Sequence, residues 1–414
     1  MAAAISEPSR AARRPDVFYL YAARAARGIG DGFAFIILPA YLSELGFDPF
    51  RIGVVATAAL LGSAATTLAV GFLAARYDLR NLLLIGALVM ALTGLAVANS
   101  HALVLILIIV FIGSLNPSTG DLGMIVPLEH AMLARGAADT DRTRIFARYS
   151  LIGTASTAAG ALAAATPDFA VSLGASRLGA LEAMFYVYAA LGAIGVLLYW
   201  RLPHAAPQQA NTRLAGLGPS RRIVYKLAAL FSLDAFAGGF VVPSILALWL
   251  FERFDLSLAV ASVFFFWTNV LSALSYPVAV RLARRFGLVN TMVFTHIPSS
   301  LCLVLAAFSP SLPIVLGLLL VRAALAQMDV PTRTSYVMAV VTPAERTAAA
   351  SVTAVPRSLA SSVSPTLSGA LLATSFAGLP LVACGVLKIV YDIALLLSFR
   401  HVKPPEERST SEVS

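Results

Sequence analysis

Charged residues are scarce in this chain of 414 residues. Asp, Glu, Lys and Arg together make up 12% of the sequence, where about 25% is usual for a soluble protein. Hydrophobic residues make up 59%. This composition excludes an ordinary soluble globular protein and indicates an integral membrane protein.

Cysteine is nearly absent as well. Cys302 and Cys384 are the only two, and both lie in apolar runs, which excludes a disulfide framework and a clustered thiolate metal site. The chain also lacks a Gly-x-x-x-x-Gly-Lys-Ser/Thr run, so we do not expect it to hydrolyse ATP by the P-loop mechanism. No signal-peptide cleavage pattern follows the first arginines, and we expect no cleaved signal. No cofactor and no metal ion are expected, and energy must come from a gradient or a partner.

Long apolar runs fill most of the chain. A spanning helix needs about 20 mostly apolar residues, and these runs are uniformly apolar rather than alternating as in the strands of a membrane barrel. The sequence therefore predicts an all-α membrane protein with twelve transmembrane helices, at residues 18–43, 51–75, 81–99, 102–128, 145–166, 181–200, 224–250, 257–280, 289–308, 312–341, 349–374 and 379–399.

Lys and Arg are concentrated in the loops on one side. If both termini are cytoplasmic, the outer loops carry only Arg51, Arg177 and Arg253, as the positive-inside rule requires. We therefore expect both termini in the cytoplasm. We also expect a monomer, located in the plasma or inner membrane of the cell. The bias also accounts for the net charge of +9, so no nucleic-acid partner is expected, and no basic patch interleaved with aromatics is present.

The two halves of the chain resemble each other. LAARYDLRN at 73–81 aligns with LARRFGLVN at 282–290, and RYSLIGTASTAAGALA from Arg148 aligns with RSLASSVSPTLSGALL from Arg357, both at an offset of 209 residues. Two matches at one offset indicate a duplicated six-helix unit, and such halves commonly enclose a central solute path. The predicted organisation is a tail at 1–17, an N-terminal bundle at 18–200, a cytoplasmic linker at 201–223, a C-terminal bundle at 224–399 and a tail at 400–414.

Twelve helices in two six-helix bundles, a basic linker and the loop GFLAARYDLRN resemble the major facilitator superfamily (MFS) over essentially the whole chain. The resemblance implies a secondary transporter, not an enzyme. The loop is similar to the family's signature between helices two and three, although the usual acidic residue and glycine are replaced by Ala75 and Asp78. The residues that the resemblance and the repeat assign to the gate and its conformational change are Gly71, Arg76, Asp78, Arg80, Arg148, Arg285 and Arg357.

Charges inside the apolar runs fall on particular helices. The first and tenth predicted helices carry three each, and the fourth and seventh hold Asp121 and Asp234. In the family that the chain resembles, these four helices line the central cavity. A charge at the bilayer centre costs several kcal/mol unless it is paired or hydrated, so we expect these side chains to face one another or water.

The charged residues of the tenth predicted helix share one face. Arg322, Asp329 and Arg333 are separated by seven and four positions, which places them within about 20° of one azimuth. Pro331 lies among them and predicts a kink. On the first helix Arg24, Arg27 and Asp31 likewise share one face.

Two interpretations of these charges stay open. In the first, Arg24, Arg27, Arg322 and Arg333, with Asp121 and Asp234, bind an organic or inorganic anion, because guanidinium groups suit oxyanions; Asp31 and Asp329 then take up a coupling proton, with His130 and His296 as candidate relays. In the second, the acids and arginines only neutralise one another. Lys388 and Asp392, one helical turn apart, are expected to pair with each other.

Other functions and couplings also stay open. The alternatives are a multidrug/proton antiporter, weakened by the absence of a Gly-Pro-x-x-x-Gly-Gly run on helix five, and a solute sensor on a carrier fold. A sodium-coupled mechanism is a further alternative.

Overall fold

The computed structural model describes residues 14–74, 76–113, 115–118, 123–136, 139–204, 218–342 and 345–399. These residues are folded into sixteen α-helices and contain no β-strand. In the first half lie α1 (Arg14–Glu44), α2 (Pro49–Leu73), α3 (Leu79–Ala98), α4 (Leu103–Ile112), α5 (Ile125–Gly136), α6 (Asp139–Ala163), α7 (Thr166–Ser172) and α8 (Arg177–Trp200). In the second half lie α9 (Arg221–Gly239), α10 (Pro243–Phe254), α11 (Leu258–Phe286), α12 (Leu288–Phe308), α13 (Leu312–Ala326), α14 (Asp329–Val340), α15 (Arg346–Leu372) and α16 (Leu379–Phe399).

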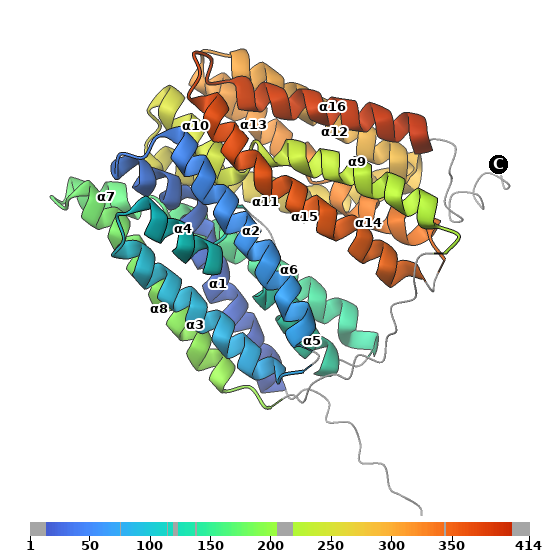
Figure 1. The fold of residues 1–414 in the computed structure, drawn as a ribbon, viewed down its shortest axis with the longest axis horizontal. Helices are drawn as coiled ribbons and strands as arrows, with labels where there is room; N and C mark the ends of the chain where they lie inside the picture. The colour runs from blue at the N-terminus through green and yellow to red at the C-terminus, as the bar shows by residue number, and fades with distance from the viewer. Residues whose placement is uncertain are drawn as a thin grey trace, which may run out of the picture.

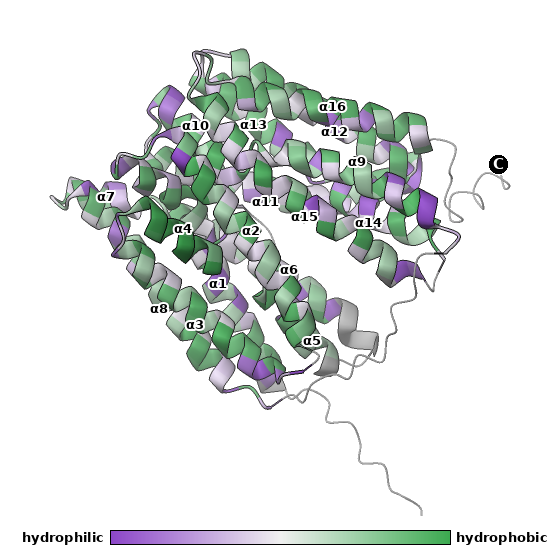
Figure 2. Cartoon of the chain, viewed as in Figure 1, coloured by the Kyte–Doolittle hydropathy of each residue, from purple (hydrophilic) through white to green (hydrophobic). Residues whose placement is uncertain are grey.

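Each predicted span corresponds to one helix or to a consecutive pair, and α7 is an additional short helix. Nine segments within the described ranges are long and apolar enough to cross a membrane. Figure 2 shows hydrophobic colour along most of the helices, with hydrophilic residues at their ends and on a few inner segments such as α14. The predicted class, an all-α membrane protein, is confirmed.

Three predicted spans are interrupted rather than continuous. Span four is divided into α4 and α5, and span seven breaks before Pro243, which begins α10 at a position where its missing N–H costs nothing. Span ten ends as α13 at Ala326 and resumes as α14 at Asp329. Pro331 stands in the first turn of α14, where no intrahelical N–H bond is lost, and the span is interrupted at Gln327 and Met328, just before this proline.

The duplication is visible in where the helices begin. The pairs α2 and α11, α3 and α12, and α4 and α13 each begin 209 residues apart. This offset equals the one between the two sequence matches, so the repeated sequence corresponds to a repeated structure. Figure 1 shows the two sets of helices as two bundles that lie together near α10 and diverge toward α5 and α14.

The apolar core is continuous across the two bundles on one side only. We call the side with α7 and the α1–α2 turn the distal side, and the side where α1 begins and α16 ends the terminal side. On the distal side one core cluster joins α1, α2, α10, α11 and α15. On the terminal side the N bundle and the C bundle have separate cores. The bundles are therefore sealed together at the distal side and packed independently at the terminal side.

Close contacts across the bundles gather at this distal seal. The Thr57 and Thr366 hydroxyls are hydrogen-bonded at 2.8 Å, and the Asp168 carboxylate accepts the Ala259 N–H at the start of α11 at 2.9 Å. The α2 and α15 backbones approach so closely that a Cβ at Gly53 would lie 2.3 Å from the Pro365 carbonyl oxygen. Only glycine fits at this crossing.

Candidate functional site

In the N bundle, Arg27 of α1 is paired with Glu129 of α5. Arg27 Nη2 lies 2.5 Å from Glu129 Oε2, and the hydroxyls of Tyr149 (α6) and Tyr199 (α8) donate to the same carboxylate. Glu129 is fully buried and Arg27 is 7% exposed. Four helices thus converge on one carboxylate whose charge is matched by an arginine.

Arg24 and Asp31 flank this pair on α1. The Arg24 guanidinium is buried, lies 5.1 Å from the centre of the Tyr149 ring and rests on Gly153, where a Cβ would come within 2.2 Å of it. Asp31 is half-buried and lines a polar pocket of about 20 Å³ with Arg27 and Thr66. That volume accommodates about one water molecule. The three charges predicted to share a face of the first helix do lie on the inner side of the bundle.

In the C bundle, Asp234 of α9 occupies the corresponding central place. Its two oxygens lie 3.1 Å from Arg333 Nη1 (α14) and 2.6 Å from Lys388 Nζ (α16). Arg333 also pairs with Asp329 at 3.1 Å. Asp234, Asp329 and Arg333 are each less than 7% exposed, so the acids and the arginine of this group are brought together as expected.

The two central pairs have opposite polarity. In the N bundle the first span carries the cation, Arg27, and the fourth span carries the carboxylate, Glu129. In the C bundle the order is reversed: the seventh span carries the carboxylate, Asp234, and the tenth span carries the cation, Arg333. A buried ion left without its partner is strongly unfavourable. Each bundle is therefore internally neutralised at the same relative position, which supports the pairing interpretation for Arg27, Arg333 and Asp234.

Two expectations for the C bundle were wrong. Within the described residues Arg322 forms no ion pair with Asp329; its charge lies instead in electrostatic range of the Cys302 and Cys384 thiols on neighbouring helices. Lys388 and Asp392 do not pair with each other. Lys388 bonds to Asp234, and Asp392 bonds to His296 Nδ1 at 3.0 Å. Neighbouring helices offered better partners than the next turn of the same helix.

Two arginines on inner helices have no acidic partner in the part of the chain described here. Neither Arg322 nor Arg357 forms an ion pair within 4.0 Å. Arg322 is half-buried, while Arg357 on α15 is exposed although its charge lies in electrostatic range of Arg333, Asp234 and Asp329. Their guanidinium groups are therefore not neutralised by a carboxylate of the described residues. Asp121, also predicted at the site, lies outside the described residues.

Most predicted gate residues lie at the terminal side. Gly71 in the last turn of α2, Arg76 after α2, Arg148 on α6 and Arg285 at the end of α11 are exposed. Within the described ranges none of these arginines forms an ion pair. The basic loops of the two bundles are therefore not latched to each other through these residues.

Asp78 is bound to the start of the linker instead. Its carboxylate caps α3 by accepting the Arg80 N–H at 2.8 Å and lies 3.0 Å from His204 Nδ1. The Arg80 guanidinium donates to the Trp200 carbonyl oxygen at 2.7 Å. These contacts join the α2–α3 loop to the end of α8 within the N bundle.

Glu345 anchors the other end of the linker to the C bundle. Its carboxylate accepts hydrogen bonds from the hydroxyls of Thr342 and Ser220 at 2.6 and 2.7 Å, and from the backbone N–H groups of Gly218 and Ser220. The hydroxyl bonds, with the backbone bonds, lower the pKa of Glu345 to about 2. Both ends of the linker are thus held by an acidic residue.

Replacing Glu345 by glutamine should lower the thermal unfolding temperature at pH 7. The lowered pKa means that the ionised side chain stabilises the fold fully above its unfolded pKa of about 4.3, and that this contribution is lost as pH falls toward about 2. The difference between wild type and Glu345→Gln should therefore shrink below about pH 4, as measured by thermal unfolding across pH. Glu252→Gln, an exposed position, should match wild type throughout. A difference that stays constant with pH would contradict the assignment.

Several residues of the two clusters were missed by the sequence reading. Glu129 lies one residue beyond the predicted end of span four, and the hydroxyls of Tyr149 and Tyr199 carry no charge to draw attention. Arg27 offered the signal that could have found Glu129, because a buried arginine needs an acidic partner. Lys388 and Asp392 were noticed but assigned to each other.

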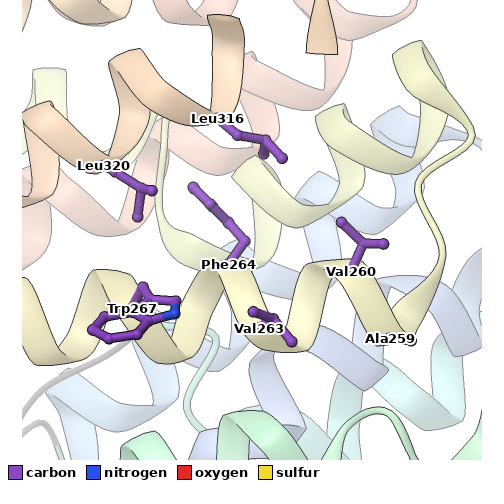
Figure 3. Close-up of a pocket in the computed structure, with 7 residues that line it drawn as sticks. All are labelled: Ala259, Val260, Val263, Phe264, Trp267, Leu316 and Leu320. Atoms are coloured by element: carbon purple, nitrogen blue, oxygen red, sulfur yellow. The ribbon is translucent and has the colours of Figure 1, made fainter. Parts of the chain in front are cut away.

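An apolar groove in the C bundle is not part of this polar site. A groove of about 470 Å³ lies between α11 and α13, and Figure 3 shows that it is lined only by apolar and aromatic side chains, among them Phe264, Trp267 and Leu320. No charged group lines it. Across the described residues no cluster of three His, Cys, Asp or Glu side chains could hold a metal ion.

Two repeated helical bundles sealed at one side, with paired charges inside each, define a polytopic membrane protein of the carrier type. The sequence profile of the Major Facilitator Superfamily matches residues 20–251 and 227–414. The chain belongs to this superfamily of membrane transporters, and the family resemblance is confirmed.

Known proteins resemble the chain over nearly its whole length. It is 24% identical to the uncharacterized membrane protein YJR124C of Saccharomyces cerevisiae over 93% of this chain and 94% of that protein. The structure is similar to the nucleoside transporter NupG, with a TM-score of 0.73 and 16% identity over 94% of this chain and 100% of that one. It is also similar to an inward-facing bacterial homologue of the human lysosomal transporter Spinster (TM-score 0.72, 14% identity, 96% and 98% coverage) and to the human organic anion transporter MFSD10 (0.64, 16%, 94% and 100%).

Proposed function

We propose that the chain is a secondary active transporter that moves a small solute by alternating access. The observation that supports this most directly is the distribution of the apolar core, which is shared by both bundles at the distal side and divided at the terminal side. A path between such bundles is open to one side at a time. The structure then corresponds to the state open at the terminal side.

The solute is proposed to be an organic or inorganic anion. Arg322 and Arg357 carry charges without a carboxylate within 4.0 Å in the described part of the molecule, and Arg333 could exchange Asp234 or Asp329 for an oxyanion of the solute. Arg24 and Arg27 offer the same chemistry from the N bundle. The structurally similar MFSD10 is named an organic anion transporter, whereas NupG is named a nucleoside transporter. Because these solutes differ, the proposal of an anion rests on the charges of this chain.

A proton is the proposed coupling ion. Asp31 lines the polar pocket beside Arg27, and Asp329 shares Arg333 with Asp234. A carboxylate whose arginine is taken by an anionic solute loses its charge partner and can bind a proton. The excess of Lys and Arg in loops of the terminal side supports cytoplasmic termini in the plasma or inner membrane, and a monomer is the proposed working unit.

A thermal-stabilisation screen of the purified protein tests the proposal. We expect at least one of phosphate, citrate and benzoate to raise the unfolding temperature, because a ligand that binds the folded state stabilises it. The increase should disappear in Arg357→Ala and fall in Arg322→Ala, and it should persist in Arg51→Ala, an exposed distal arginine. Stabilisation by tetraphenylphosphonium but by no anion would favour drug efflux; stabilisation by uridine alone would contradict an anionic solute.

A further inference from the structure

A buried histidine and aspartate lie behind the Asp234 pair in the C bundle. His296 of α12 and Asp392 of α16 are joined through Nδ1 and Oδ1 at 3.0 Å. Asp392 is fully buried and His296 is 3% exposed. Neither the carboxylate nor the imidazole contributes to the binding of Arg333, so the pair is not needed to neutralise the central arginine.

The second ring nitrogen of His296 faces two competing partners. Nε2 lies 3.3 Å from Lys388 Nζ and 3.9 Å from Asp234 Oδ1. An ammonium group can only donate hydrogen bonds, so in this arrangement Nε2 is an unprotonated acceptor and the ring proton sits on Nδ1, donated to Asp392. The single lone pair of Nε2 accepts either the Lys388 bond or a proton, because it cannot hold both.

We propose that Nε2 of His296 is a proton-binding atom of the transporter, exchanging its bond to Lys388 for a proton. A hydronium ion supplies the proton, so one N–H bond forms as one O–H bond breaks and water leaves; Lys388 keeps its protons and its 2.6 Å contact with Asp234. The resulting imidazolium lies between two carboxylates, those of Asp392 and Asp234. It then competes with Arg333 for Asp234.

The charges around His296 set the direction of the coupling. Asp234 on α9 and Lys388 and Asp392 on α16 lie within 4.0 Å of the ring. The charged groups in electrostatic range of these partners or of their neighbours are Asp329 and Arg333 on α14, Arg357 on α15 and Arg322 on α13, with the uncharged Cys384 thiol and Tyr391 hydroxyl. Four cations stand against three carboxylates, so a proton on His296 raises the net charge of the group from +1 to +2. An anion is therefore attracted more strongly after the proton binds.

This coupling rests on the proposed anion transport, whereas the proton site rests on the geometry alone. With His296 protonated, Asp234 has a third cationic neighbour besides Lys388 and Arg333, and Arg333 can turn from Asp234 to the solute. Proton and anion then bind in the same direction. The expected transport mode is symport.

Hydrogen exchange at the C2 position of histidine tests the site without a solute. The rate of this exchange depends on ring protonation, and the chain has only five histidines, so mass spectrometry of the full-length protein in D2O resolves them. We expect the His296 rate to change with pH as the ring gains and loses its proton. The profile should be displaced by about one pH unit or more, in opposite senses, in Asp392→Asn and Lys388→Gln. His101, which pairs with Glu182 elsewhere, should keep its profile in both variants.

A flat His296 profile, or one that neither variant displaces, would overturn the proposal. Thermal unfolding of each variant establishes that it folds, and the nearly isosteric Asp392→Asn preserves the shape of the site if Lys388→Gln does not fold. The outcome is separate from that of the anion screen. If the His296 rate changes with pH but no anion stabilises the protein, the proposed solute is contradicted and the proton site is supported. If an anion binds but the His296 profile is flat, the proposed solute is supported and the proton site is contradicted.

Discussion

Replacing Gly53 by alanine is expected to open the distal side and reduce transport at least fivefold. The new Cβ would lie 2.3 Å from the Pro365 carbonyl oxygen of α15, and backbone on the opposite helix cannot move aside as a flexible side chain can. Overpacking of this kind costs about 1–3 kcal/mol, which shifts a two-state equilibrium roughly 5–150-fold. In the proposed alternating-access cycle this contact belongs to the distally closed state, so the penalty is expected to fall on that state.

Spin-label distances measure this shift without a known solute. In a background with Cys302 and Cys384 replaced by serine, a distal pair at Ala175→Cys and Glu252→Cys should move apart in Gly53→Ala. A terminal pair at Arg76→Cys and Arg285→Cys should move together. All four labelled positions are exposed, so the labels themselves should not disturb the packing.

Gly71→Ala is the matched control on the same helix. A Cβ at Gly71 meets nothing within 4 Å, so its distances should equal those of wild type. Gly369→Ala should reproduce the effect of Gly53→Ala, because a Cβ there would lie 2.3 Å from the Pro49 carbonyl oxygen of α2. Unchanged distances in both Gly53→Ala and Gly369→Ala would contradict the prediction, because the added Cβ atoms would then not destabilise the closed distal side.

Replacing Glu129 by glutamine is expected to destabilise the protein by about 3–5 kcal/mol, the usual consequence of leaving one member of a buried ion pair alone. Glu129 is fully buried and forms an ion pair with the buried Arg27. The loss should appear as a lower unfolding temperature and as lower recovery of folded protein. Glu182→Gln, whose side chain is 24% exposed, should change little.

The double variant Arg27→Met with Glu129→Gln decides between the two interpretations of Arg27. If the pair only neutralises itself, the double variant should recover most of the stability lost in Glu129→Gln, since no buried charge remains unmatched. Anion-induced stabilisation should then persist. If Arg27 binds the solute, stability should recover while that stabilisation is lost.

The sequence predicted the architecture because the signals for it are local. Long apolar runs mark the spans, and the helix starts at Pro49 and Leu258 carry the same 209-residue offset as the loop matches. Pro331 marked the interruption of the tenth span because a proline ring clashes with the backbone of the preceding helical turn. These features need no knowledge of which helices are neighbours.

The partner of each inner charge was decided by tertiary structure. Asp234 meets Lys388 from 154 residues away, and Arg27 meets Glu129 from 102 residues away. A spacing of four residues suggested Lys388 with Asp392, but Asp392 lies against His296 on another helix. The sequence by itself determined how many apolar segments there are, how they repeat and which of them carry charge. Packing alone decided which charges cancel and which stay available, because an ionised side chain in an apolar interior pairs with the nearest opposite charge in space.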